Sequence, residues 1–240
     1  MNKFQKYNPV ELNYPSKNGI IIFIKNPQLG KVKTRLAATL GNEHTLKIYN
    51  ILMSHTEKVT NSLEAEKYLY YSDFVDENDI WNNEIYHKSL QFEGSDLGLK
   101  MAHAFRESIR ENCSKVLIIG SDCLELSENI INDAFLQLAD NEVVIGPAND
   151  GGYYLIGFDF QTIGERCREV LQQLFIDKEW SHENVCQDAI NACDTLNLKY
   201  TKLATLIDID EESDLITCLP LLEDTSIFED NLALQELMNS

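Results

Sequence analysis

Short apolar runs alternate along this chain with longer segments in which apolar residues recur at helical spacing. A run of four to eight apolar residues between polar stretches is typical of a strand that is covered on both faces. The runs that predict strands are 19–25 (GIIIFIK), 66–72 (EKYLYYS), 115–122 (KVLIIGSD), 141–148 (NEVVIGPA), 152–158 (GYYLIGF) and, with its following loop, 199–210 (KYTKLATLIDID). Helical spacing predicts helices over 32–59, 96–112 and 127–140, two more within 162–196, and one in the C-terminal tail.

This alternation of strands and helices predicts a single α/β domain with three layers and a mostly parallel sheet. No internal repeat, low-complexity segment or linker rich in Pro, Gly or Ser divides the sequence. We therefore expect a polar N-terminal extension over residues 1–18 and one domain over residues 19–240. In an open sheet of this kind, ligands bind beyond the carboxyl ends of the strands. The residues directly after each predicted strand are therefore the candidates for chemistry.

The charge of the chain narrows the class of ligand. The 240 residues carry a formal net charge of −19, which disfavours nucleic acid as a partner of the general surface. Between Glu11 and Glu43, however, there is no acidic residue and five cations occur, which favours a small anionic ligand. No stretch approaches the length of a membrane span, and the six cysteines show no zinc-site spacing. We expect reduced thiols and a cytoplasmic protein.

The loop after the first predicted strand, KNPQLGKVKTRL (25–36), is neither a G-x-G-x-x-G motif nor a Walker A motif. Pro27 and Gly30 provide a tight turn, and the cations that follow it lie at the start of a helix, where they oppose the macrodipole. A bound anion would reverse that penalty. Phosphate binding is the favoured interpretation, and a solvated basic turn is the alternative. The candidates for phosphate contact are Lys25, Pro27, Gly30, Lys31, Lys33, Thr34 and Arg35.

Two further loops carry single carboxylates. Ser121 and Asp122 emerge at the end of the strand over 115–122, and Asp122 can hold Mg²⁺ or Mn²⁺, or merely cap the turn. Asp150 is followed by Gly151 and Gly152, which indicates that something approaches the backbone closely there. A glycine-rich bulge is the alternative for this stretch. Tyr153 and Tyr154 should face opposite sides of their strand, so at most one of them is expected to line the site.

The segment LIDIDEESDL (206–215) places two carboxylates on one side of an extended chain. Asp208 and Asp210 alternate with isoleucines, which favours a metal role for one of them, and an acidic helix cap is the alternative. A weaker candidate is the stretch over 91–105, in which Gln91, Gly94, Asp96 and Gly98 could contribute to a base or substrate pocket. There, a helix N-cap by Ser95 or Asp96 is an equally good explanation.

Taken together, these segments resemble a known family. FIKNPQLGKVKTRL, QFEGSDLGLKMAHAF, GSDCLELS, GPANDGGYYLIGF, EWSHENV and DIDEESDL occur in the order seen in a bacterial glycosyltransferase-like family. Its members are known as radical-SAM/selenodomain-associated transferases, formerly a domain of unknown function. The resemblance covers about residues 19 to 220. It implies a nucleotide-diphospho-sugar transferase (GT-A-like) fold and a more distant similarity to phospholactate guanylyltransferases and molybdenum-cofactor nucleotidyltransferases.

The resemblance also implies roles for individual residues. It places Lys25, Lys33 and Arg35 in a phosphate loop, Asp122 at the metal-binding aspartate, and Asp208 or Asp210 at the second metal ligand. Asp150, Gly151 and Gly152 fall in its substrate loop. The chain departs from the family pattern at Leu124, which replaces a proline, at Lys100, where arginine is usual, and at Glu211 and Glu212, which replace Thr-Pro. The lysine weakens a bidentate contact to phosphate or carboxylate.

The sequence thus predicts a metal-dependent transferase that uses a nucleotide-activated donor, with Mg²⁺ or Mn²⁺, a nucleotide sugar or nucleoside triphosphate, and a small-molecule acceptor. Transfer of a glycosyl group and transfer of a nucleotidyl group to a phosphorylated or carboxylated acceptor both remain open. A non-catalytic nucleotide-binding regulatory module is the third reading. The candidates are Lys33, Arg35, Asp122 and Asp150 for catalysis; Asp150, Gly151, Gly152 and Tyr153 for the substrate; Asp122, Asp208 and Asp210 for the metal; and Gly94, Asp96 and Ser121 beside the first loop for the nucleotide.

Overall fold

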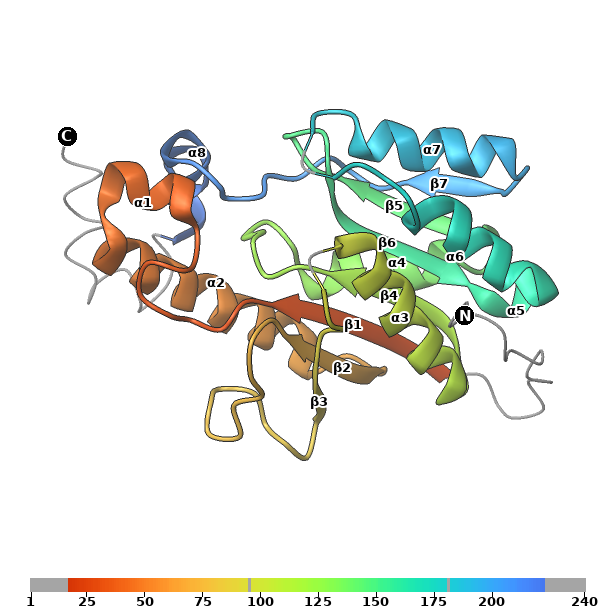
Figure 1. Cartoon of the computed structure of the whole chain (residues 1–240), viewed down its shortest axis with the longest axis horizontal. Helices are drawn as coiled ribbons and strands as arrows, with labels where there is room; N and C mark the ends of the chain where they lie inside the picture. Colours follow the sequence, from red (N-terminus) through yellow and green to blue (C-terminus); the bar gives the residue numbers. More distant parts are fainter. Residues whose placement is uncertain (1–16, 95, 181, 223–240) are drawn as a thin grey trace.

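A computed structural model describes residues 17–94, 96–180 and 182–222, and within them a central sheet is covered by helices on both faces (Figure 1). The strands are β1 (Lys17–Ile24), β2 (Glu66–Tyr71), β3 (Tyr86–Leu90), β4 (Cys113–Ile119), β5 (Val143–Pro147), β6 (Tyr153–Asp159) and β7 (Tyr200–Lys202). The helices are α1 (Thr34–Leu40), α2 (Asn42–Asn61), α3 (Leu97–Arg110), α4 (Glu128–Gln137), α5 (Phe160–Ile163), α6 (Cys167–Phe175), α7 (Val185–Thr195) and α8 (Glu212–Leu222). The predicted three-layer α/β architecture is confirmed.

The sheet has the strand order β3-β2-β1-β4-β6-β5-β7 and is mostly parallel, as predicted. Only β6 runs against its neighbours, pairing antiparallel with both β4 and β5. This direction follows from the short connection between β5 and β6, since a parallel crossover needs a dozen residues or more. As a consequence, β6 begins at the edge where the parallel strands end, and so brings Tyr153 to that edge.

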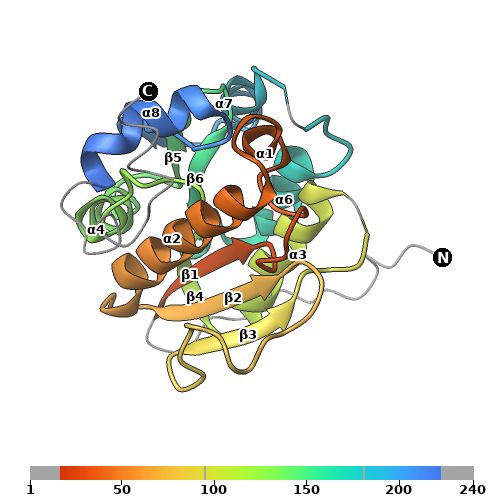
Figure 2. The same cartoon turned by 90° about the vertical axis from the view of Figure 1, so that its left-hand side faces the viewer.

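Alternate residues of the central strands enter different cores. Ile21 of β1 belongs to the cluster beneath α3, α6 and α7, while Ile20 and Ile22 belong to the cluster on the face covered by α2 and α4. Figure 2 shows α2 on one side of β1 and β2, and α3 and α6 on the other side. A strand buried on both faces explains why the sequence shows continuous apolar runs there rather than alternation.

Three elements differ from the sequence prediction. The edge strand β3 was not predicted, because only Tyr86 of its five residues is buried and no apolar run marks it. The helix expected over 32–59 is divided at Gly41, whose φ of 78° ends α1 after seven residues. The expected strand over 199–210 is regular only at Tyr200–Lys202, with one further bridge between Ala148 and Leu206.

Parts of the predicted organisation lie outside the described residues. These are residues 1–16 of the expected N-terminal extension and the tail beyond residue 222. The first strand begins at Lys17, two residues before the expected domain boundary. Among the described helices, none is long and apolar enough to cross a membrane.

Candidate functional site

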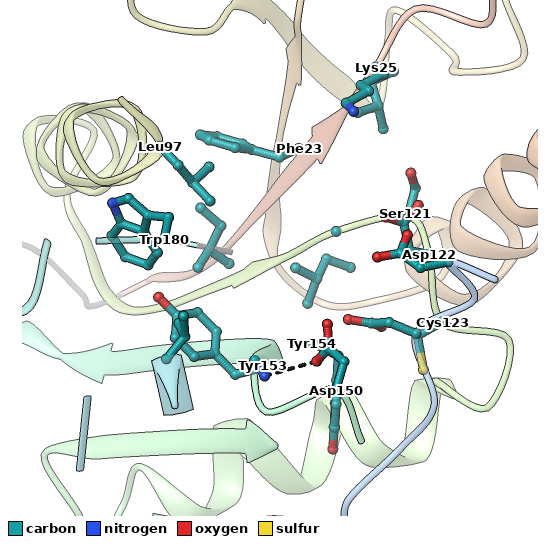
Figure 3. Close-up of a pocket in the computed structure, with 18 of the residues that line it drawn as sticks. Phe23, Lys25, Leu97, Ser121, Asp122, Cys123, Asp150, Tyr153, Tyr154 and Trp180 are labelled. Carbon is teal, nitrogen blue, oxygen red and sulfur yellow. Dashed lines mark hydrogen bonds between the residues drawn. The ribbon is translucent and has the colours of Figure 1, made fainter. Parts of the chain in front are cut away.

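A pocket of about 810 Å³ opens at the carboxyl edge of the sheet, beyond the ends of β1 and β4. From β1 the sheet continues to β2 on one side, and from β4 it continues to β6 on the other side, so the strand order reverses between β1 and β4. Ligands of open α/β sheets usually bind at such a point. Figure 3 shows Lys25, Ser121, Asp122 and Asp150 around one part of the pocket. Of the predicted site residues, those that line the pocket are Lys25, Lys33, Thr34, Arg35, Gln91, Ser121, Asp122, Asp150, Gly152, Tyr153, Asp208 and Asp210.

Lys33 is the most constrained cation of the pocket. It precedes α1 with φ 45° and ψ 51°, a left-handed conformation that costs a lysine roughly 1–2 kcal/mol. Its side chain is only 5% exposed, and its Nζ lies 2.8 Å from Asp122 Oδ2 and 2.7 Å from Asp210 Oδ1. Burial alone would lower the pKa of Lys33, but the charges of Asp122 and Asp210 outweigh burial and raise the pKa above its usual value. Lys33 is therefore a charged bridge between two carboxylates.

The two carboxylates reach this bridge from separate elements. Asp122 follows β4, and its carbonyl oxygen accepts a hydrogen bond of 2.9 Å from Ile209 N, which fixes the 206–210 segment beside it. Ile209 is fully buried, so Asp208 and Asp210 on either side of it both line the pocket, as the alternation predicted. The Asp210 carboxylate, for which a helix cap was the alternative, pairs with Lys33, while Asp214 inside α8 accepts through Oδ2 from the backbone N–H groups of residues 210 and 211.

Asp208 lies in an acidic part of the pocket. Burial, followed by the negative charge of Asp122, raises the pKa of Asp208 to about 7, and the charges of Asp150 and Asp210 act in the same direction. Four carboxylates thus influence one small volume, and Lys33 is the cation that offsets them. An acid in a cleft whose pKa is shifted by burial and by neighbouring charges, as that of Asp208 is, is typical of functional sites.

The donor set can be tested against a divalent metal. Asp122 and Asp210 converge on one cation position, and carboxylate oxygens are the ligands that Mg²⁺ and Mn²⁺ prefer. Among the described residues, no group of three or more His, Cys, Asp or Glu side chains could hold a metal ion. The pair therefore fits a metal that takes its remaining ligands from water and substrate phosphates, the usual arrangement for Mg²⁺.

Only some of the residues predicted to bind phosphate, between the end of β1 and the start of α1, line the described pocket. Lys25, Thr34 and Arg35 line the pocket, and the Arg35 side chain is 68% exposed with a 3.8 Å contact to Glu211. Pro27, Gly30 and Lys31 are exposed and are not among the described residues that line it. Gly30, at φ 73°, shapes the turn instead, with Lys31 N donating to Gln28 O. Because α1 has only seven residues, side-chain charge is the larger contribution to anion binding here.

Tyr49 of α2 holds this loop in place and was missed by sequence reasoning. Its hydroxyl accepts from Lys25 N and donates to Lys25 O, both at 2.9 Å, and lies 3.3 Å from Ser121 Oγ. Burial, followed by the charge of Asp122, raises the pKa of Tyr49 to about 12, so the phenol stays protonated at neutral pH. Nothing in the sequence distinguishes this tyrosine from an ordinary apolar position of an amphipathic helix.

The Asp-Gly-Gly turn confirms a close approach, but its partner is the protein's own chain. A Cβ on Gly151, which has φ 91°, would lie 1.9 Å from the carbonyl oxygen of Glu183, and Cys186 N donates to Gly151 O. Gly151 therefore packs the segment before α7 against the turn and is not among the described lining residues. Gly152 does line the pocket, and its N–H donates to Asp150 Oδ1 at 2.8 Å, which orients that carboxylate (Figure 3).

The weaker candidates at the start of α3 have structural roles. Asp96 is the N-cap of α3 and accepts from Leu99 N, while Gly94 is exposed; neither is among the described lining residues. Ser95, the other predicted cap, lies outside the described residues. Gly98 allows close packing, since a Cβ there would lie 1.8 Å from Phe175 O. Gln91 does reach the pocket, held by bonds from Nε2 to Ile24 O and Tyr70 O.

The opposite part of the pocket is apolar. Tyr153 and Tyr154 enter different cores, as the strand period requires, yet both line the pocket, so the expectation that at most one would do so is wrong. Trp180, in the segment before α7, and Val185, the first residue of α7, also line the pocket. Figure 3 shows Trp180 near Leu97 and Tyr153. The EWSHENV segment carried the family resemblance, but the sequence assigned no role to these two residues.

A model of the DUF2064 family, described as uncharacterised proteins conserved in bacteria, matches residues 55–182, more than half of the chain. The chain belongs to this family. The matched segment contains both Asp122 and Asp150, at the end of β4 and in the turn before β6. A sequence comparison with curated proteins gives no match.

Solved structures agree with the predicted fold and superfamily. The chain is 25% identical to a "putative nucleotide-diphospho-sugar transferase" of Desulfovibrio desulfuricans G20, with a TM-score of 0.77 over 94% of this chain and 96% of that one. It also shares its fold with a 4-diphosphocytidyl-2C-methyl-D-erythritol synthase of Anaerococcus prevotii (13% identity, TM-score 0.53, 86% and 96% covered). A third neighbour is the manganese complex of Rv0371c of Mycobacterium tuberculosis H37Rv (12%, 0.51, 88% and 100%). This DUF2064 protein therefore has a nucleotide-diphospho-sugar transferase fold, and its likeness to the Desulfovibrio desulfuricans protein supports the prediction of a transferase.

Proposed function

We propose that this DUF2064 protein is a metal-dependent transferase whose donor is activated by a nucleotide. The observation that carries the proposal is the convergence of Asp122 and Asp210 on one cation position, 2.8 and 2.7 Å from Lys33 Nζ, in a pocket that Lys25 and Arg35 also line. Carboxylates that can hold a divalent metal, set beside cations that can hold phosphates, are the combination that phosphoryl-group chemistry uses. The likeness to a manganese-bound protein and to a nucleotide-sugar transferase supports the same reading.

Asp122 and Asp210 would hold the metal, and Asp208 would add negative charge beside them. A bound Mg²⁺ or Mn²⁺ would neutralise the donor phosphates and the leaving group. Lys33, which lies beside both carboxylates, would be placed to pair with a phosphate oxygen of the donor. Arg35 and Lys25 are placed to bind further phosphate oxygens, and Arg35 is suited to do so in a bidentate manner.

The transfer itself forms one bond and breaks another. An oxygen of the acceptor bonds to the transferred carbon or phosphorus atom, and the bond from that atom to the leaving phosphate oxygen breaks. The proton of the acceptor oxygen passes to Asp150, which the N–H of Gly152 orients and which lines the pocket. Lys33 and Arg35 stabilise the negative charge that develops on the leaving group.

A nucleotidyl transfer is a second candidate within this class. Lys25, Lys33, Thr34 and Arg35 all line the pocket, and a triphosphate needs more cationic cover than the diphosphate of a nucleotide sugar. The two reactions release different products, pyrophosphate in nucleotidyl transfer and a nucleoside diphosphate in glycosyl transfer. The third reading, a non-catalytic nucleotide-binding module, predicts binding without either product.

Thermal unfolding tests the proposal directly. Wild type, Asp122→Asn and Asp210→Asn are unfolded with ATP, GTP, CTP, UTP and a panel of nucleotide sugars, each with and without Mg²⁺ or Mn²⁺. A donor present at about 100 times its Kd should add about 2.7 kcal/mol of stability. For a domain of this size that raises the Tm by about 5–10 °C.

We expect the rise to require the metal and to disappear in both variants. The best donor is then incubated with candidate acceptors, and release of pyrophosphate or nucleoside diphosphate separates the two reactions. A Tm that no nucleotide raises in wild type would exclude a nucleotide-activated donor.

A further inference from the structure

The pocket contains a surface that the donor chemistry does not use. We call the apolar wall the group of side chains that line this part of the pocket: Phe23, Leu97, Met101, Tyr153, Trp180 and Val185. They come from β1, from α3, from β6 and from the segment that leads into α7. In Figure 3, Phe23, Leu97, Tyr153 and Trp180 lie together, apart from Ser121, Asp122 and Asp150.

The fold keeps the apolar wall open and fixed. Leu97 is 40% exposed although it lies in the pocket, and Trp180 is half-buried. The Trp180 ring is held at 6.4 Å from the ring of Phe175, and its edge lies over Gly98, where a Cβ would come within 2.9 Å. An apolar surface held open within a concave pocket is the usual contact of the non-polar part of a small ligand.

Two parts of the bound substrates could cover the wall, the nucleobase or the acceptor. A base needs hydrogen-bonding groups to specify it. Such groups line the pocket on the other side of β1, where Gln91 is fixed by Ile24 O and Tyr70 O and where the Ser72 hydroxyl accepts from Asn26 N. On the wall, the Tyr153 hydroxyl is directed to Met101 Sδ, 3.9 Å away. This arrangement favours binding of the nucleotide on the side of the pocket near β2 and β3, and binding of the second substrate on the side near β6.

We infer that the apolar wall binds the acceptor, and that the acceptor is a small molecule in which an apolar group adjoins a polar or anionic one. This inference rests on the proposed function, since it names the second substrate of the same site. The polar part follows from the neighbours of the wall. Lys100, His182 and Glu183 also line the pocket, and Lys100 lies three residues after Leu97, on the same side of α3.

The experiment uses Trp180 as its own reporter. The chain has two tryptophans, and Trp81 is fully buried in the other core against Tyr86, so Trp81→Phe leaves Trp180 as the single one. The dye 8-anilinonaphthalene-1-sulfonate is titrated into this variant, and energy transfer from Trp180 to the dye is recorded. Leu97→Gln is added in the same background, with Leu136→Gln on α4, which is 71% exposed, as the matched control.

We expect Leu97→Gln to weaken dye binding about tenfold or more, given the apolar area it removes, and Leu136→Gln to leave it unchanged. Phenyl phosphate should displace the dye at a concentration at least about tenfold lower than glycerol 3-phosphate does. A mixture of ATP, GTP, CTP and UTP with Mg²⁺ should raise the Tm and leave the dye bound.

Three results would overturn the inference. Dye binding that is insensitive to Leu97→Gln would show that the wall is not an apolar site. Equal displacement by the two phosphates would refute the apolar class of acceptor. Displacement by the nucleotide mixture would assign the wall to the nucleobase. Failure of the proposed function gives a different result. No nucleotide would then raise the Tm, while Leu97→Gln would still weaken dye binding. The apolar wall would remain a binding site, but not one for an acceptor.

Discussion

The Nζ atom of Lys33 lies 2.7 Å from Oδ1 of Asp210, and the two residues are 177 positions apart in the sequence. The same nitrogen lies 2.8 Å from Asp122 Oδ2. The ammonium group therefore stands where two carboxylates converge, which is also where a divalent cation would bind them. The Lys33 ammonium thus neutralises Asp122 and Asp210 in this structure. A metal that binds these carboxylates must displace the ammonium group or share them with it.

Replacing Lys33 by methionine should make the protein bind Mn²⁺ more tightly in the absence of nucleotide. A unit charge about 4 Å from another is worth about 4 kcal/mol at the effective dielectric constant near a protein surface. Loss of this positive charge should therefore tighten Mn²⁺ binding by at least about tenfold, since each 1.4 kcal/mol is a factor of ten. Titration calorimetry with Mn²⁺ alone measures the change. Metal-free stability should fall by about 1–3 kcal/mol, because Asp122 and Asp210 lose their partner but are partly solvated.

Lys88→Met is a matched control for this variant. Lys88 is equally buried and pairs with Asp79 at 2.8 Å, and neither residue belongs to the described pocket lining. It should lose stability without any gain in Mn²⁺ affinity. If the Lys33→Met and Lys88→Met variants bind Mn²⁺ with the same affinity, Lys33 does not compete with a metal for Asp122 and Asp210.

Arg35→Gln should separate binding from stability. Arg35 is 68% exposed, and its ion pair in the described part of the chain is a 3.8 Å contact with Glu211, so its loss should change the free energy of unfolding by no more than about 0.5 kcal/mol. Removing a phosphate contact should nevertheless weaken nucleotide binding by roughly 10–100-fold, because charge-assisted hydrogen bonds are worth about 1.5–3 kcal/mol. Lys31→Gln removes the same charge from the same loop at a position outside the described pocket lining, and should have little effect. Equal losses in the two variants would point to general electrostatic attraction instead.

The position of the site could be predicted from sequence because its residues directly follow strands with strong apolar signals. Asp122 follows β4 and Lys25 follows β1, so the rule for open sheets was sufficient to bring them together. The alternation around Ile209 likewise predicted that Asp208 and Asp210 share a side.

What could not be predicted depends on tertiary contacts. The sequence assigned Lys33 to phosphate, but its partners in the structure are the two carboxylates expected to bind metal, a relation that no local pattern encodes. Tyr49 looks like a core residue of an amphipathic helix, and only the fold places its hydroxyl between Lys25 and Ser121. The edge strand β3 escaped detection because its outward residues need not be apolar.

The two glycines after Asp150 should respond differently to alanine. Gly151→Ala combines φ 91° with a Cβ 1.9 Å from Glu183 O, so the segment before α7 must move, and we expect a loss of about 2–4 kcal/mol. Gly152→Ala meets only Asp150 Oδ1 at 3.1 Å, without a positive φ, and should cost less than about 1 kcal/mol. Urea unfolding gives both values. A Gly151→Ala variant as stable as Gly152→Ala would show that the close approach of Glu183 is not required.

Tyr49→Phe should weaken nucleotide binding although the lost hydroxyl need not touch the nucleotide. The hydroxyl bonds both the N–H and the carbonyl of Lys25, so its removal leaves these backbone groups without that partner and should cost about 1–3 kcal/mol. The Lys25 backbone would then be less well fixed, and the loss should appear as a smaller nucleotide-dependent rise in Tm. Tyr86→Phe is the comparison, because its buried hydroxyl bonds Thr60 and Glu57 O, away from the pocket lining. That variant should lose similar stability but keep the full nucleotide response. If both variants keep it, the contact of Tyr49 with Lys25 stabilises the fold alone; if Tyr49→Phe loses it and Tyr86→Phe does not, Tyr49 is a positioning residue for the phosphate loop.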